Sequence, residues 1–227
     1  ELARRAHAEQ TGARGLVSAV EKALLTFETR LPSSEVRKFP IDLAVIKNPD
    51  TAWERLSAPG EQDDLEQEFS ALFEAERQWI VNYLAARPET YFERHELSVT
   101  PARMEVAARL YSTQIMDLDK IMAQIKTAHT RIKKSEQDFY QAHGINILLE
   151  ESAVDWILLR QALAGAPSLE ALLAKVLNDF EHGLKLIREK TGRNGFSLSS
   201  EALDNPEKFI GKLIQQDLKQ VPRLERE

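Results

Sequence analysis

Residues 11–16, with the sequence TGARGL, open a helical pattern that returns near the other end of the chain, where residues 164–169 are AGAPSL. Apolar residues follow each stretch at intervals of three and four, the spacing that lines one face of a helix. At a constant offset the two series match position by position: Leu16 with Leu169, Val20 with Leu173, Leu24 with Leu177, Phe27 with Phe180, Glu28 with Glu181, and Leu31 with Leu184. The ends of the chain therefore share one helical pattern.

A second set of matches lies beyond the helix. After a four-residue shift in the loop, the matched pairs are Phe39 with Phe196, Ile41 with Leu198, Ile46 with Leu203, Asn48-Pro49 with Asn205-Pro206, and Leu56 with Leu213. Two amphipathic helices share leucines by chance, but chance does not readily repeat a Phe-containing segment and an Asn-Pro helix start at consistent spacing. We interpret the two ends as an internal repeat.

The copy near the carboxy terminus has one part that the other lacks. Residues 145–149 (INILL) are rich in branched side chains and predict a strand, followed by a buried helix that Ser152 caps. Ser168 and Gly192 are predicted to begin and end the next helix. No equivalent strand precedes the first copy, so we expect the extended piece at residues 38–42 to have no sheet partner. Pro40 also favours an edge position for this piece.

The middle of the chain is predicted to be helical. One helix is expected over residues 61–87, and Thr100-Pro101 is a strong start for another that could reach Tyr140. A heptad-like seam supports the second helix: Leu118, Ile121, Ile125, Ala128, Ile132 and Phe139. The seam predicts an antiparallel helical hairpin or a coiled-coil arm, although Ser135 interrupts it.

The predicted fold is therefore α+β and predominantly α-helical, with two small helix–strand domains joined by a helical insertion. Three domains are expected. Residues 1–59 form the first small domain, which is truncated at its start, and residues 60–142 form the helical insertion. Residues 143–227 form the second, degenerate copy of the small domain. Because the sequence begins inside a helical pattern and without Met, we expect it to be a fragment of a longer polypeptide.

Residues 11–16, followed by Glu21, Leu24-Leu25 and residues 31–33 (LPS), resemble the small domain of ClpX-type AAA+ protein unfoldases. The resemblance covers the first sixty or so residues and, more weakly, the region after Gly144. It implies that Gly-Ala-Arg is the sensor-2 motif, whose Arg14 reaches the phosphates of ATP held by a large domain. An arginine near a helix start suits that role, because its donors and the positive helix end both favour phosphate. Pro167 occupies the matching position of the second copy, which has therefore lost this contact.

The ATPase machinery itself is missing from the sequence. No G-x-x-x-x-G-K-[ST] loop occurs, and no strand ending in paired acids is present. We therefore expect that this chain is not an enzyme and needs no cofactor by itself. The ATP-binding core is expected to lie upstream of Glu1 in the parent polypeptide. The resemblance implies oligomerisation through the ATPase ring of the parent protein, and a protein substrate or adaptor as partner.

Composition limits the other classes of function. The net charge of −6 argues against a nucleic-acid surface, and the short basic run at Arg131, Lys133 and Lys134 is interpreted as a solvated helix face. The chain has no cysteine, which fits a cytoplasmic location, and no apolar run of the roughly 20 residues that a membrane span needs. We expect no nucleic-acid or membrane partner.

Other candidate sites are weak. The five histidines, His7, His95, His129, His143 and His182, lack ligand-like spacing, so no metal site is predicted. Asp117 and Asp119 point to different helix faces, which disfavours joint acid–base chemistry. Trp53, Trp79 and Trp156 each fall in an apolar pattern and are predicted to pack in the core. The alternative to the unfoldase hypothesis is a helical scaffold or coiled-coil interaction protein without a nucleotide role.

Overall fold

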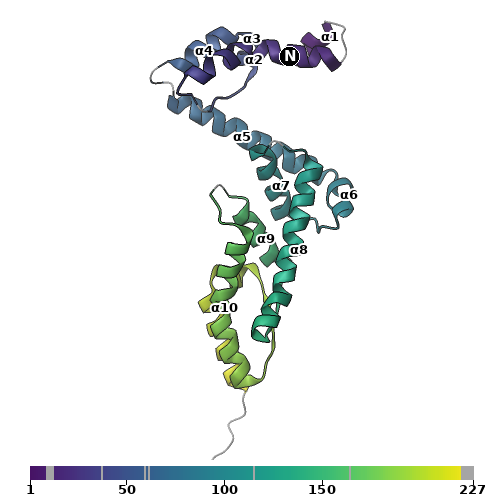
Figure 1. The fold of residues 1–227 in the computed structure, drawn as a ribbon, viewed down its shortest axis with the longest axis vertical. Coiled ribbons are helices and arrows are strands. Elements are labelled where there is room, and N and C mark those ends of the chain that lie inside the picture. The colour runs from purple at the N-terminus through teal and green to yellow at the C-terminus, as the bar shows by residue number, and fades with distance from the viewer. Residues whose placement is uncertain are drawn as a thin grey trace, which may run out of the picture. The chain divides into compact units, whose positions relative to one another are not determined.

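The computed structural model describes residues 1–8, 13–36, 38–58, 60, 62–114, 116–163 and 165–220 (Figure 1). The chain is predominantly helical and carries one small parallel sheet of two strands, which confirms the predicted mixture of many helices and little β-structure. Contacts divide it into two compact units, Glu1–Glu76 (unit 1) and Arg77–Glu227 (unit 2). Each unit is described by itself.

Unit 1 is a set of short and medium helices around a small core. Its elements are α1 (Leu2–Ala8), α2 (Ala13–Arg30), the 3-10 turn η1 (Leu31–Ser33), α3 (Leu43–Lys47), α4 (Pro49–Ser57) and the first part of α5 (Gln62–Ala85). Phe27 is its centre: the ring stacks on Phe39 with centroids 5.1 Å apart and meets the edge of Trp53 at 6.2 Å. Val45, Leu56 and Leu65 complete the buried cluster.

One prediction for unit 1 needs correction. The apolar face of α2 was predicted to include Leu16, but Leu16 is 44% exposed. The buried face of α2 is instead formed by Ala19, Ala23 and Phe27. Residues 38–42 are extended but form no strand, as expected for a segment without a described sheet partner. An additional helix, α3, follows them, and Asp42 caps it by accepting a hydrogen bond from the Val45 amide at 2.9 Å.

Unit 2 contains the end of α5 and all the remaining elements. These are α6 (Pro88–Tyr91), η2 (Glu93–His95), α7 (Pro101–Thr113), α8 (Leu118–His143), β1 (Asn146–Leu149), α9 (Glu151–Gln161), α10 (Leu169–Thr191), β2 (Gly195–Leu198), α11 (Ser200–Asp204) and α12 (Pro206–Gln220). One continuous core runs through the unit and includes Ile80, Ile125, Phe180 and Leu213.

The long helix predicted from Thr100 to Tyr140 is wrong, because the chain breaks between α7 and α8. Thr100 does begin α7, accepting a hydrogen bond from the Arg103 amide at 3.1 Å. The break comes from Asp117, which caps α8 by accepting from the Lys120 amide at 2.9 Å. The two helices pack against each other, and the predicted seam of α8 faces the core. Ser135 is buried in that seam and is satisfied, since its hydroxyl donates to the Ile132 carbonyl at 2.6 Å.

The strand predicted at residues 145–149 forms as β1, and it pairs in parallel with β2, with Ile147 opposite Phe196 and Leu149 opposite Leu198. Side chains of α8 satisfy the backbone of Leu149: Glu136 accepts from its amide at 2.8 Å and Lys133 donates to its carbonyl at 2.6 Å. Lys133, predicted to lie on a solvated face, therefore helps to hold α8 against β1. Such side-chain bonds use backbone groups that would otherwise be open to further pairing.

The helix boundaries in the second copy follow the predictions with one exception. Ser168 caps α10, accepting from the Ala171 amide at 3.2 Å, and Gly192 ends that helix with a positive φ of 74°. Ser152 does not cap α9; Glu150 holds the cap position without a side-chain bond. The Ser152 hydroxyl instead accepts from the Ser200 amide at 3.2 Å, so it ties α9 to the start of α11.

The order of elements matches between the two copies. In each, a long helix is followed by an extended segment, a helix of five residues and an Asn-Pro step into a further helix. Asn48 and Asn205 even share their backbone conformation, with φ and ψ of −134° and 71° against −144° and 77°. Leu56 and Leu213 are buried at equivalent places on α4 and α12. This shared order supports the internal repeat.

The predicted domain boundaries do not coincide with the two compact units. The division between the units falls within α5, after Glu76, and the core of unit 2 joins the predicted insertion to the predicted second domain. The three-domain division, at residues 59/60 and 142/143, stays a prediction.

Candidate functional site

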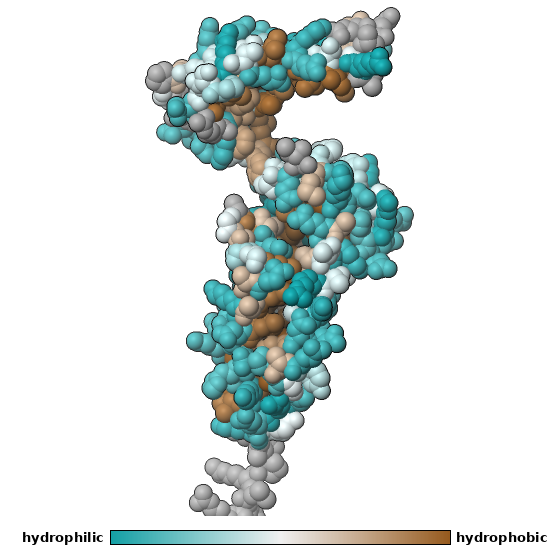
Figure 2. Space-filling model, in the orientation of Figure 1, coloured by the Kyte–Doolittle hydropathy of each residue, from teal (hydrophilic) through white to brown (hydrophobic). Residues whose placement is uncertain are grey.

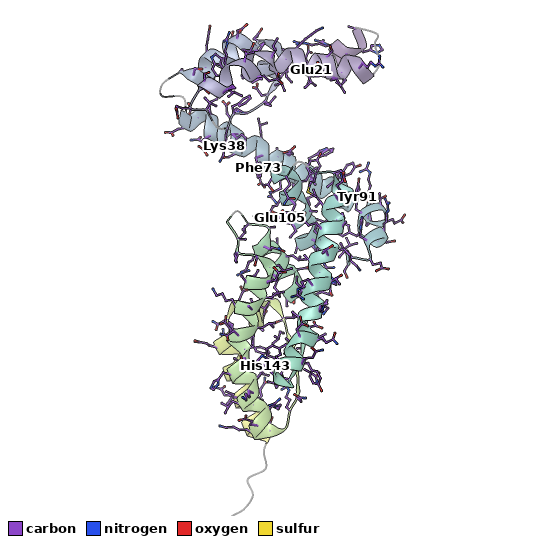
Figure 3. All side chains as sticks on the ribbon, viewed as in Figure 1. Glu21, Lys38, Phe73, Tyr91, Glu105 and His143 are labelled. Carbon is purple, nitrogen blue, oxygen red and sulfur yellow. The ribbon has the colours of Figure 1, made fainter. Side chains whose placement is uncertain are left out.

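Arg14, the one residue predicted to bind a ligand, lies in the first turn of α2 and is exposed. Glu21, labelled in Figure 3, marks the middle of the same helix. Among the described residues, the Arg14 side chain has no ion-pair or hydrogen-bond partner. Thr11 and Gly12, the start of the motif, lie outside the described residues. A guanidinium without a partner at the positive end of an 18-residue helix is chemically suited to an anionic group.

The matching position in the second copy offers no such chemistry. Pro167 is exposed just before Ser168, the cap of α10. It has neither a charge nor a backbone donor, and Ser168 already accepts from the first turn of the helix. The two copies thus present different surfaces at the same structural place.

Arg103 is the centre of the main electrostatic feature of unit 2, and no local pattern in the sequence predicts it. This side chain is 0% exposed, although arginine is rarely buried without charged partners. It bonds the Glu151 carboxylate through Nη2, donates from Nη1 to the Ser98 carbonyl at 3.1 Å, and lies 2.9 Å through Nε from Asp155 Oδ1. The last contact is an ion pair whose geometry falls short of a hydrogen bond. Arg103 therefore joins α7 to the first turns of α9.

The two carboxylates respond differently to this environment. Burial raises the pKa of Asp155 above its ordinary value, and the Thr100 side chain and the positive charge of Arg103 offset only part of that effect. Burial also acts to raise the pKa of Glu151, but the hydrogen bond and charge of Arg103 outweigh it, so this pKa is lowered. The Arg103 guanidinium is fully enclosed, whereas the Glu151 side chain remains 47% exposed. The guanidinium therefore serves to hold α7 against α9, with one of its two carboxylate partners open to solvent.

His129 completes the cluster and makes it sensitive to pH. Its Nε2 lies 3.7 Å from Glu151 Oε1. Burial, and then the positive charge of Arg103, lower the pKa of His129 below 6.5, and the nearby Glu151 carboxylate offsets only part of this. The folded state consequently favours the neutral imidazole.

We expect unit 2 to lose stability as the pH falls below 6.5, because the unfolded chain takes up a proton at His129 before the folded chain does. Replacing His129 with glutamine should flatten this part of the pH profile. The free energy of unfolding, measured by urea titration between pH 5 and pH 8, tests this. His182→Gln, on the exposed side of α10, is the control and should keep the slope of the parent chain. Equal slopes for all three proteins would contradict the assignment.

The remaining candidates are separated in the structure. Asp117 caps α8, whereas Asp119 pairs with Arg94 at 3.3 Å and His95 at 3.2 Å. His143 pairs with Glu181 on α10 at 3.2 Å. In the part of the chain that the structure describes, no cluster of three or more His, Asp or Glu side chains could hold a metal ion. None of the described helices is both long and apolar enough to cross a membrane.

The prediction that all three tryptophans pack in the core is wrong for Trp79, which is 59% exposed and stacks on Tyr83 with centroids 5.3 Å apart. Trp53 is partly buried against Phe27. Trp156 is also partly buried, donates from Nε1 to Asp204 at 2.7 Å, and lies under the Arg160 guanidinium.

Comparison with known proteins adds no identification. No protein-family model matches the chain, and neither a curated protein nor a solved structure matches it.

Proposed function

We propose that this chain is the carboxy-terminal regulatory and oligomerisation region of an ATP-dependent, Clp-type AAA+ protein unfoldase. It contains two lid-like domains, of which the first contacts nucleotide through Arg14 and the second serves packing or interaction. The chain does not hydrolyse ATP by itself. ATP and the ring of subunits belong to the parent protein, which acts in the cytoplasm on a protein substrate or through an adaptor.

The single observation that carries the proposal is the position of Arg14. The sequence motif that suggests a sensor arginine falls at the start of a long helix, and its guanidinium is exposed and has no partner among the described residues. A helix start with an available arginine can meet a phosphate held by a neighbouring domain. The matching order of elements in both copies supports the idea of a duplicated domain, and Pro167 supports loss of the contact in the second.

A helical interaction protein without a nucleotide role is the second candidate. Trp79 favours it, because an aromatic ring that is 59% exposed beside Tyr83 is typical of residues that dominate protein interfaces. In this case Arg14 would have no role in coupling.

The proposal predicts that Arg14→Ala, introduced into the intact polypeptide, weakens ATP-driven unfolding of a protein substrate by roughly tenfold or more, since a hydrogen bond to a charged group contributes about 1.5–3 kcal/mol. The residue is exposed, so circular dichroism of the variant should match that of the parent protein. Substrate unfolding and ATP turnover are measured together. Lys47→Ala, which removes an exposed cation at the end of α3, is the matched control and should retain full coupling. Unchanged coupling in Arg14→Ala would favour the second candidate.

A further inference from the structure

A surface groove occurs at the same place in both copies of the repeat. In unit 2 the groove lies between α11 and α12 and has a volume of about 450 Å³; its lining includes Ala202, Asn205, Lys208, Phe209, Lys212 and Leu213. A groove of unit 1 includes the matching residues Val45, Asn48, Thr51, Ala52, Arg55 and Leu56. The two asparagines share their backbone conformation and the two leucines are both buried, so this part of the repeat is alike in both units.

In unit 1 the start of α5 closes the groove. Leu65 and Glu68 of α5 belong to its lining, and its volume is about 150 Å³. Leu65 lies in the buried cluster with Val45 and Leu56. Glu68 accepts two hydrogen bonds from the Arg55 guanidinium, at 2.6 and 3.1 Å. One apolar side chain and one carboxylate, three positions apart on a helix, therefore cover the groove of unit 1.

The groove of unit 2 offers similar chemistry without such a cover, because every residue that lines it belongs to residues 199–216. Lys212 occupies the position of the paired arginine of unit 1, and Lys208 precedes it by one turn on the same face of α12. In the described part of the chain, neither ammonium group has an ion-pair or hydrogen-bond partner. Two carboxylates also line the groove: Asp204 is already paired with Arg160 at 3.1 Å, and Glu201 lies on α11.

We propose that the α11–α12 groove binds an acidic amphipathic helix of a partner protein, in the way that unit 1 binds the start of α5. A leucine of the partner enters the groove, and a glutamate three positions later pairs with Lys212. The start of α5 is the model for this helix: Asp63 and Asp64 lie in its first turn, and Figure 2 shows apolar side chains, in tan and brown, along α5. Such a helix complements a groove that carries two unpaired lysines. The proposal does not depend on a nucleotide role for Arg14.

The segment that follows α12 is less suited to this groove than a separate polypeptide. In unit 1 seven residues separate Ser57, at the end of α4, from Leu65, so the chain has room to return. In unit 2 only three residues separate Gln220 from Leu224, which lies outside the described residues. The four steps from Gln220 to Leu224 span at most about 14 Å, and Leu213 lies about 10 Å back along α12, so little chain remains for the turn.

The test adds a synthetic peptide with the sequence of residues 62–76 (QDDLEQEFSALFEAE) to the full chain and follows the backbone amides by NMR. The amides of Lys212 and Leu213 should shift with peptide concentration. Those of Arg55 and Leu56 should not, since α5 already covers the groove of unit 1. A control peptide with Leu65→Ser and Glu68→Gln should bind at least about tenfold more weakly. Absence of shifts at Lys212 and Leu213, or equal affinity of the two peptides, would overturn the proposal.

A charge exchange tests the predicted ion pair. Lys212→Glu should weaken binding of the peptide about fivefold, the loss expected for a partly exposed ion pair, and a peptide with Glu68→Lys should recover the affinity. Lys134→Glu, on the exposed side of α8, changes the net charge equally and should leave the affinity unchanged. The amide spectrum of unit 2 verifies that each variant is folded. Failure of the exchanged peptide to bind Lys212→Glu more tightly than the original peptide does would overturn the pairing.

Two further measurements exclude other occupants of the groove. A chain that ends at Gln220 should bind the peptide with the affinity of the full chain. Binding that appears only after removal of residues 221–227 would overturn the proposal, because the chain would then cover its own groove. Shifts of the Lys212 and Leu213 amides with protein concentration, in the absence of peptide, would also overturn it, because a second copy would then be the occupant.

Discussion

Replacing Arg103 with methionine is expected to lower the free energy of unfolding of unit 2 by about 3–5 kcal/mol at pH 7, the range found when one partner of a buried ion pair is removed. The side chain is 0% exposed and neutralises Glu151 and Asp155 at the start of α9. Methionine fills much of the same volume, so the loss reports unpaired charge more than a cavity. Urea unfolding followed by Trp156 fluorescence, with Trp53 and Trp79 replaced by phenylalanine, measures unit 2 specifically.

The control for this variant is Arg109→Met, since Arg109 makes a partly exposed ion pair one turn away with Glu105, which is labelled in Figure 3. We expect it to cost less than about 1 kcal/mol. The deficit of Arg103→Met should shrink as the pH falls from 7 towards 4, because the two carboxylates then take up protons and lose the charge that opposes burial. Adding Glu151→Gln and Asp155→Asn should restore much of the stability at pH 7. A loss below about 0.5 kcal/mol in Arg103→Met would contradict a supporting role for the cluster.

Gly183→Ala is expected to destabilise unit 2 by about 1–3 kcal/mol, although alanine normally favours a helix over glycine. A Cβ at Gly183 on α10 would lie 2.5 Å from Ile210 Cδ1 and 2.7 Å from Ile210 Cγ2 on α12. Ile210 cannot easily move, because a β-branched side chain has one strongly preferred rotamer in a helix. The glycine therefore sets how closely α10 and α12 approach. Urea unfolding at pH 7 measures the effect.

Gly211→Ala is the matched control, because Gly211 is helical and a Cβ there meets nothing within 4 Å. That change should stabilise the chain by roughly 0.5–1 kcal/mol. The double variant Gly183→Ala with Ile210→Val should be more stable than Gly183→Ala alone, since the shorter side chain removes the Cδ1 contact. An increase in stability from Gly183→Ala, like the increase expected from Gly211→Ala, would show that the stability of unit 2 does not depend on close packing of α10 against α12.

Local signals in the sequence predicted many of the helix ends correctly. Thr100-Pro101, Ser168 and Gly192 act through backbone hydrogen bonds or a positive φ within a few residues, so the sequence nearby determines them. The Asn-Pro steps at residues 48 and 205 are equally local. Asp117 is the same kind of local signal at the start of α8, but the sequence favoured one continuous helix from Thr100 through the apolar seam at Leu118 to Phe139.

Features that depend on distant partners could not be predicted in the same way. Arg103 is buried because Glu151 and Asp155, far along the chain, lie beside it in space. In the sequence it is an ordinary cation in a helix. Leu16 illustrates the opposite case: its spacing is that of a core residue, but the residues described around it leave it exposed.

The most direct measurement is ATP turnover by the intact polypeptide that carries residues 1–227, compared with turnover and calorimetric ATP binding by residues 1–227 alone. The proposed function predicts hydrolysis by the intact polypeptide, and neither hydrolysis nor measurable binding by the isolated region. An intact polypeptide that neither binds nor hydrolyses ATP would contradict it, as would tight ATP binding by the isolated 227 residues.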